Sequence, residues 1–120
     1  MVACPAFLET ARVAGHGGLA LAVDRIGPMP ARVLYAHGFG QTRHAWTATA
    51  RALAARGLGG MAVDARGHGE SDWLPGGAYR LDQFVGDAHA LAAQAAPLPV
   101  WVGASMGGLV GLIAQAESAT

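Results

Sequence analysis

Short apolar runs alternate with helical patterns along this sequence, and each run leads into a glycine-rich loop. The runs of strand length cover residues 32–36, 60–64 and 100–103. Apolar residues at helical spacing follow over 42–56, 81–95 and 105–115, and Gly57 and Pro97 end the first two helices. Because a strand can rejoin its sheet in the same direction only after a long connection, this alternation predicts parallel strands joined by right-handed crossover helices.

The start of the sequence predicts an antiparallel hairpin. Residues 10–14 and 19–26 are extended segments, joined by the glycine-rich stretch 15–18. The predicted order is therefore β-β-β-α-β-α-β-α, an α/β fold whose doubly wound, mostly parallel sheet begins with an antiparallel hairpin. With 120 residues, 52% of them apolar and 13% charged, the chain suits one domain around a buried sheet.

Charge and cysteine content exclude several classes of function. Eight basic residues balance eight acidic ones, so we expect no nucleic-acid or anionic-membrane partner and favour a small neutral substrate. Cys4 is the only cysteine, which leaves no internal disulfide and no spacing typical of a metal site. Residues 1–10 show no leader pattern, and no stretch is long and apolar enough for a membrane span. We expect a cytoplasmic protein without metal or cofactor.

The segment 103–107, Gly-Ala-Ser-Met-Gly, matches the pattern G-x-S-x-G between the third apolar run and its helix. This context predicts a sharp, strained turn that exposes Ser105 as a nucleophile. Gly103, Gly107 and Gly108 would let the strand and helix backbones approach closely around the turn. The start of the helix would also supply N–H groups and positive partial charge for an oxyanion.

A second loop, His37-Gly38-Phe39-Gly40, follows the first predicted parallel strand. Loops at the carboxyl ends of parallel strands meet at one edge of the sheet, where ligands bind. An acyl-transfer site needs two N–H donors, so we expect the backbone of Phe39 to supply one and that of Met106 the other. The His37 side chain is expected to fix the loop by hydrogen bonds rather than to transfer protons.

The third loop covers residues 64–72 and is expected to support the site. Gly67 and Gly69 permit positive φ, and Arg66 can pair with a nearby carboxylate. Trp73 follows this loop and is, with Phe39, a candidate for lining the substrate site. The remaining tryptophans are expected in the core: Trp46 and Trp101.

Together, segments 37–40, 64–71 and 103–108 resemble the α/β-hydrolase superfamily in order and spacing. The resemblance is to small serine esterases, lactonases and cofactor-free haloperoxidase-like enzymes, and it implies hydrolysis of an ester, lactone or similar acyl substrate. It speaks against the epoxide-hydrolase and haloalkane-dehalogenase branches, whose nucleophile at this position is an aspartate. Family members are considerably longer, so residues 1–120 would be the N-terminal portion of one domain, without its C-terminal strands and lid.

In that family the acid and the histidine of the catalytic triad follow the serine. Residues 107–120 contain no histidine, so the catalytic acid and base are missing from this chain, and we expect the chain alone to be nearly inactive. The histidines that precede the turn would have to replace the base: His16, His44, His68 and His89.

Two other functions compete with hydrolysis. The chain can be a non-catalytic remnant or interaction module, whose exposed strand edge at 100–103 binds a complementing C-terminal half or a second copy. Residues 15–20 also match the dinucleotide pattern G-x-G-x-x-A. That match precedes a strand instead of opening a helix, which disfavours dinucleotide binding.

Overall fold

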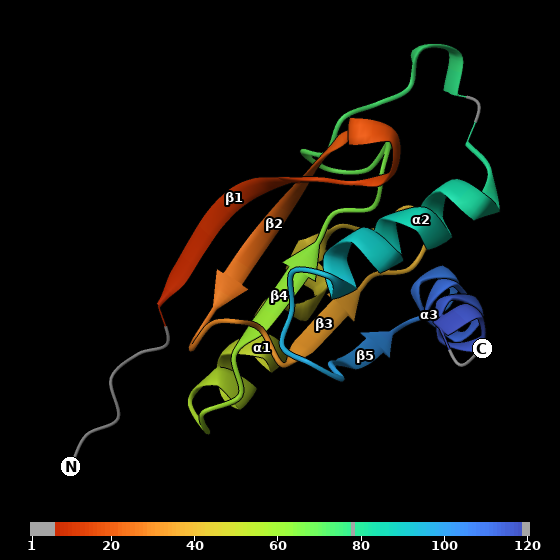
Figure 1. The fold of residues 1–120 in the computed structure, drawn as a ribbon. Coiled ribbons are helices and arrows are strands. Elements are labelled where there is room, and N and C mark those ends of the chain that lie inside the picture. The colour runs from red at the N-terminus through yellow and green to blue at the C-terminus, as the bar shows by residue number, and fades with distance from the viewer. Residues whose placement is uncertain (1–6, 78, 119–120) are drawn as a thin grey trace.

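The computed structural model describes residues 7–77 and 79–118, and its elements follow the predicted order (Figure 1). Cys4 lies outside the described residues. The strands are β1 (Leu8–Ala14), β2 (Ala20–Ile26), β3 (Val33–Ala36), β4 (Gly60–Val63) and β5 (Val100–Gly103). The helices are α1 (Thr47–Ala54), α2 (Leu81–Ala92) and α3 (Met106–Ser118), with short 3₁₀ turns η1 (His16–Gly18), η2 (Arg43–Trp46) and η3 (Pro75–Gly77).

The five strands form one mixed sheet in the order β1-β2-β4-β3-β5. β3 pairs in parallel with β4 and with β5, as the alternation predicts. The predicted hairpin of β1 and β2 extends the sheet, and its strand β2 pairs with β4 in antiparallel orientation. In this register Ala36 lies opposite both Val63 and Gly103, so the three parallel strands end together. The loops that follow them therefore share one edge of the sheet.

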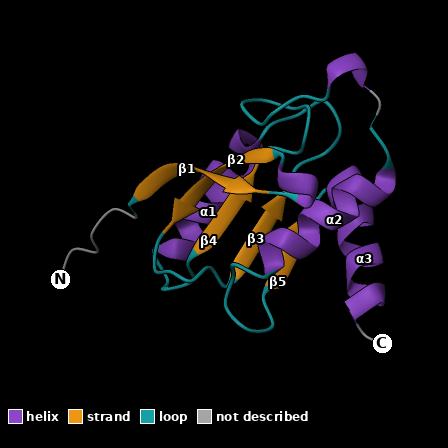
Figure 2. Cartoon of the chain, turned by 45° about the horizontal axis from the view of Figure 1, so that its top comes forward, coloured by secondary structure: helices purple, strands orange, loops and turns teal. Residues whose placement is uncertain are grey.

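Helices cover both faces of the sheet, with α1 on one side and α2 and α3 on the other (Figures 1 and 2). Successive side chains of each strand point to opposite faces. The face toward α2 packs Leu34 and Met61 near Leu91, whereas the face toward α1 packs Tyr35 near Ala50. Every residue of β3 and β4 is buried, which explains why these strands are continuous apolar runs in the sequence.

The helix boundaries differ from the prediction where backbone groups find partners outside the helix. The segment predicted as one helix from residue 42 begins with η2 and becomes α-helical only at Thr47. α2 ends at Ala92 instead of residue 95, and the N–H of Ala96 donates to the carbonyl oxygen of Ala31 at the sheet. α3 begins after Ser105 and continues to Ser118. Within the described ranges, no helix has the length and apolar character of a membrane span.

Candidate active site

Ser105 occupies a sharp bend between β5 and α3. Its φ of 54° lies in the left-handed region, where a non-glycine residue is strained by about 1–3 kcal/mol. Its side chain is exposed, and the helix begins at the next residue, Met106. Leu98 is the other non-glycine residue with positive φ in the described part of the chain, and it lies between two prolines. The predicted strained, solvent-facing position of Ser105 is thus present.

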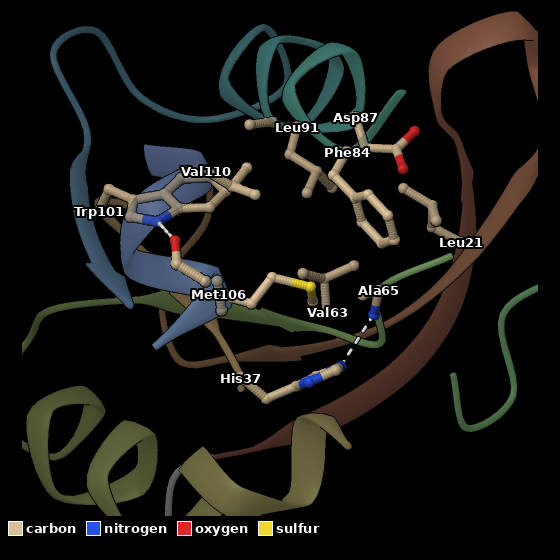
Figure 3. Close-up of a pocket in the computed structure, with 13 residues that line it drawn as sticks. Leu21, His37, Val63, Ala65, Phe84, Asp87, Leu91, Trp101, Met106 and Val110 are labelled. Atoms are coloured by element: carbon tan, nitrogen blue, oxygen red, sulfur yellow. Dashed lines mark hydrogen bonds between the residues drawn. The ribbon is translucent and has the colours of Figure 1, made fainter. Parts of the chain in front are cut away.

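Two glycines make this bend possible. A Cβ on Gly103 would lie 2.5 Å from the carbonyl carbon of Gly107, and one on Gly107 would collide with the carbonyl oxygen of Ala36. Gly108 is less constrained, because its Cβ would lie 3.3 Å from the nearest atom, the Gly103 oxygen. The indole Nε1 of Trp101 donates to the Gly107 oxygen at 2.9 Å and ties the strand to the helix (Figure 3).

The loop after β3 lies beside the bend. A Cβ on Gly38 would be 3.5 Å from the Cβ of Ser105, which places the start of the Gly38–Phe39 peptide next to the serine. The hydrogen bonds of the described residues leave the backbone N–H groups of Phe39 and Met106 without an acceptor, whereas the N–H groups of Gly40 and Gly107 have one. Two unpaired amides therefore flank Ser105, as an oxyanion site requires.

His37 is buried and holds two loops together. Its Nε2 accepts a hydrogen bond from the N–H of Ala65 at 2.9 Å (Figure 3). The proton of the neutral ring therefore resides on Nδ1, which donates to the Gly38 oxygen at 2.8 Å. Burial lowers the pKa of His37 from its usual 6.5. With both nitrogens engaged, the ring fixes the loop, as the sequence analysis expects.

Arg66 anchors the third loop. Its Nε and NH2 donate to the two carboxylate oxygens of Asp87 at 2.7 and 2.8 Å, and the hydrogen bonds to Asp87 raise the pKa of Arg66. Both side chains are buried, so the pair links this loop firmly to α2. Gly67 and Gly69 adopt φ of 73° and 50°, the left-handed conformation predicted for them.

The side chain of Arg43 is buried among three carboxylates, of which that of Glu70 is exposed, and the sequence analysis missed this ion cluster. Its guanidinium contacts Asp64 at 2.5 Å, Glu70 at 2.7 Å and Asp24, whose Oδ1 lies 3.0 Å from Nε. Burial alone would lower the pKa of Arg43, but the hydrogen bond to Glu70 and the carboxylates of Asp24 and Asp64 raise it. The local sequence offered no signal, because Arg43 sits in a stretch predicted as an ordinary helix.

An apolar cavity of about 30 Å³ lies between the sheet, α2 and α3 (Figure 3). Its wall includes Leu21, Val63, Phe84, Leu91, Met106 and Val110. Such a volume holds about one water molecule, so this cavity is a gap in the core and not a site for an acyl substrate. The candidates for contacting substrate lie on the surface instead, with 77% of Phe39 and 69% of Trp73 exposed. Trp46 and Trp101 pack against the core, as predicted.

The other histidines have contacts away from Ser105. His68 bonds the N–H of Gly40 through Nε2, and His89 lies 2.7 Å from Glu117 on the surface of α2 and α3. His44 is exposed on η2, and His16 lies in the η1 turn against α2. None of these described contacts brings an imidazole to Ser105. The described part of the chain also contains no group of three or more His, Cys, Asp or Glu side chains that could hold a metal ion.

A mixed sheet with helices on both faces and a strained serine turn after its edge strand defines the class, an α/β-hydrolase fold. Residues 27–119 match the profile of the α/β-hydrolase family described as serine aminopeptidase, S33, and the chain belongs to that family. No curated protein sequence matches the chain.

Similar solved structures include several epoxide hydrolases. A mutant enzyme from Vigna radiata has a TM-score of 0.82 at 26% identity, and the match covers 93% of this chain and 35% of that one. A laboratory-evolved variant of the potato enzyme has a TM-score of 0.84 at 25% identity, covering 94% and 37%. Epoxide hydrolase A from Mycobacterium thermoresistibile has a TM-score of 0.79 at 28% identity, covering 90% and 34%. The chain thus spans about a third of the length of these structures.

Proposed function

We propose that this chain carries the nucleophile and oxyanion site of a serine hydrolase that acts on an ester, lactone or similar small neutral acyl substrate. The observation that carries the proposal is the strained, exposed Ser105 beside two unpaired backbone amides, those of Phe39 and Met106. A single cysteine in the sequence leaves no internal disulfide, and we place the protein in the cytoplasm as part of the proposal.

In the proposed reaction, Ser105 Oγ attacks the substrate carbonyl carbon while a general base takes the hydroxyl proton. The carbonyl electron pair moves onto oxygen, where the N–H groups of Phe39 and Met106 stabilise it. Collapse of this intermediate expels the alcohol, which leaves with the proton from the base, and water then hydrolyses the acyl-enzyme by the same steps. The base and its acid would come from residues outside 1–120, because no described histidine contacts Ser105.

The identity of residue 105 favours acyl substrates over epoxides. A serine oxygen that opened an epoxide would be left as an ether, which has no carbonyl for water to attack. A serine that attacks an ester becomes an acyl-enzyme, which water can cleave. The family description names a serine aminopeptidase, and amides are acyl substrates as well. Aminoacyl amides therefore belong in the assay beside esters and lactones.

Labelling with a fluorophosphonate probe tests the proposal. We expect the probe to modify Ser105 in the longest reading frame that contains residues 1–120, and Ser105→Ala to abolish the modification. Residues 1–120 alone should react far more slowly, since loss of the base lowers turnover of serine hydrolases about 10⁶-fold. Mass spectrometry of the peptide spanning β5 and α3 identifies the site. An unmodified Ser105 in both proteins would refute the proposal.

The exposed edge of β5 favours a second candidate function, docking of another chain. β5 pairs with β3 on one side, and its other side has no strand beside it in the described structure. Val100 is 58% and Leu98 96% exposed there, and Leu112 of α3, which is 72% exposed, lines a groove with Pro99 and Trp101. Unpaired apolar edges favour strand addition, either by a C-terminal complement or by a second copy. Val100→Lys should abolish association in sedimentation experiments, and an oligomer that survives this change would refute edge pairing.

A further inference from the structure

Two histidines tie the loop after β3 to the loop after β4 in a reciprocal manner. His37, in the first loop, accepts the N–H of Ala65 in the second at 2.9 Å. His68, in the second loop, accepts the N–H of Gly40 in the first at 3.0 Å. The two rings also lie against each other, with centroids 5.1 Å apart. Each loop thus contributes one imidazole and one amide to the contact.

The protonation of His68 follows from its partners. A backbone N–H can only donate, so Nε2 facing Gly40 must present its lone pair. The opposite nitrogen, Nδ1, lies 3.0 Å from the carbonyl oxygen of Arg66 and must carry the proton that this acceptor binds. The contacts of His68 thus assign Nε2 as the acceptor and Nδ1 as the donor. Because Nε2 is occupied, this ring is not the base for Ser105.

These contacts hold both peptide units that flank the Cα of Phe39. The carbonyl oxygen of the Gly38–Phe39 unit accepts from Nδ1 of His37 at 2.8 Å and from the N–H of Gln41 at 3.0 Å. In a trans peptide the N–H points opposite to the C=O, so the Phe39 N–H is directed away from these donors. The next unit, Phe39–Gly40, is held by His68 through the Gly40 N–H.

We infer that His68 is a positioning residue for the oxyanion site: its Nε2 holds the Phe39–Gly40 peptide and its ring packs on Phe39, which fixes the direction of the Phe39 N–H before substrate binds. The Phe39 ring meets the His68 ring edge-on, at 5.3 Å between centroids. The Nδ1 of His68 is hydrogen-bonded to the carbonyl oxygen of Arg66. The buried ion pair with Asp87 holds Arg66 in place. A fixed donor stabilises a developing oxyanion without reorganisation.

This inference rests on the proposed function, and a matched pair of variants tests it in the longest reading frame that contains residues 1–120. His68→Gln places an amide group where Nε2 was and can still accept from Gly40. His68→Asn reaches only the position of Nδ1, so it keeps the contact with Arg66 and loses the one with Gly40. We expect fluorophosphonate labelling of Ser105 to stay near the wild-type rate in His68→Gln and to fall about 10²-fold in His68→Asn.

Amide hydrogen exchange at Gly40 supplies a second readout that does not depend on activity. Gly40 should be protected in the wild type and in His68→Gln, and exchange freely in His68→Asn. Equal labelling rates for the two variants would overturn the inference, whether or not Gly40 loses its protection. An unlabelled wild type would refute the proposed function and this role together. In that case protection of Gly40 would still report whether His68 ties the two loops, which keeps the two failures distinguishable.

Discussion

Breaking the buried ion pair between Arg66 and Asp87 should destabilise the chain far more than removing the pair completely. The two side chains are 2% and 8% exposed and share hydrogen bonds of 2.7 and 2.8 Å. Asp87 also accepts the N–H of His16 at 2.8 Å, and Arg66 donates to the His16 oxygen at 3.0 Å. The pair therefore joins the η1 turn, the loop after β4 and helix α2.

The expected magnitudes follow from this burial. Among the described hydrogen bonds, Asp87→Leu leaves a buried guanidinium that donates only to the His16 oxygen, and Arg66→Met leaves a buried carboxylate that accepts only from the His16 N–H. Each single change should lower the free energy of unfolding by about 3–5 kcal/mol, the usual effect of an unpaired buried charge. The double variant buries no charge, so it should be clearly more stable than either single variant.

Urea unfolding followed by tryptophan fluorescence measures this double-mutant cycle. Since about 3–5 kcal/mol is a large share of the stability of a domain, the measurement needs a stabilising osmolyte at constant concentration. The partly exposed pair of Arg25 and Glu9, with side chains 33% and 61% exposed and 3.7 Å apart, is the control, and its removal should change the free energy of unfolding by less than about 1 kcal/mol. The reasoning would be refuted if the losses of unfolding free energy in the two single variants summed to the loss in the double variant within about 0.5 kcal/mol.

Three further predictions concern single sites. Gly107→Ala should lower stability by about 1–3 kcal/mol in urea unfolding, because the new Cβ meets the Ala36 backbone, whereas the less crowded Gly108→Ala should be tolerated; equal effects would contradict the proposed close approach. Tyr35→Phe should raise the unfolding free energy by about 1 kcal/mol, because the hydroxyl is buried without a partner in the described residues, and a loss of that size would disprove this view. Burial lowers the pKa of His37 from 6.5, so its contribution to stability should be complete above about pH 6.5 and be lost as the pH falls through the lower folded pKa. Urea midpoints measured from about pH 5 to 8 should therefore fall more steeply on the acid side for the wild type than for His37→Gln. Equal dependence of the two midpoints on pH would argue against a role of His37 protonation.

Strands, crossover helices and the serine turn could be predicted because their causes are local. The apolar runs that became β3 and β4 are buried on both faces, and such strands need side chains that are apolar throughout. The turn at Ser105 needs small residues where strand and helix cross, and the glycines at 103 and 107 supply them. Helix ends were less predictable, since α2 stops where Ala96 bonds Ala31, far away in the sequence.

His37 and Arg66 were predicted as supporting residues, but Arg43 and the role of His68 escaped the sequence analysis for the same reason. Arg43 meets Asp24 only because β2 lies beside β4 in the sheet, and nothing near either residue in the sequence indicates this neighbour. The position of His68 in the sequence makes it a candidate base, yet in the structure its Nε2 accepts a hydrogen bond from the N–H of Gly40. The partner of an imidazole depends on how strands β3 and β4 place the two loops that follow them. The residue type alone does not specify this partner.

The amino-acid sequence by itself determined the α/β class, the opening hairpin, and a serine held on a glycine-lined bend between strand and helix. These features depend on side-chain periodicity and on backbone conformations that only certain residues adopt, and both act over a few neighbouring positions. Only the tertiary structure decided that Arg66 pairs with Asp87, that two histidines hold the peptides around Phe39, and that Arg43 meets Asp24 and Asp64. Those outcomes depend on strand order and register, which bring together groups that are distant along the chain.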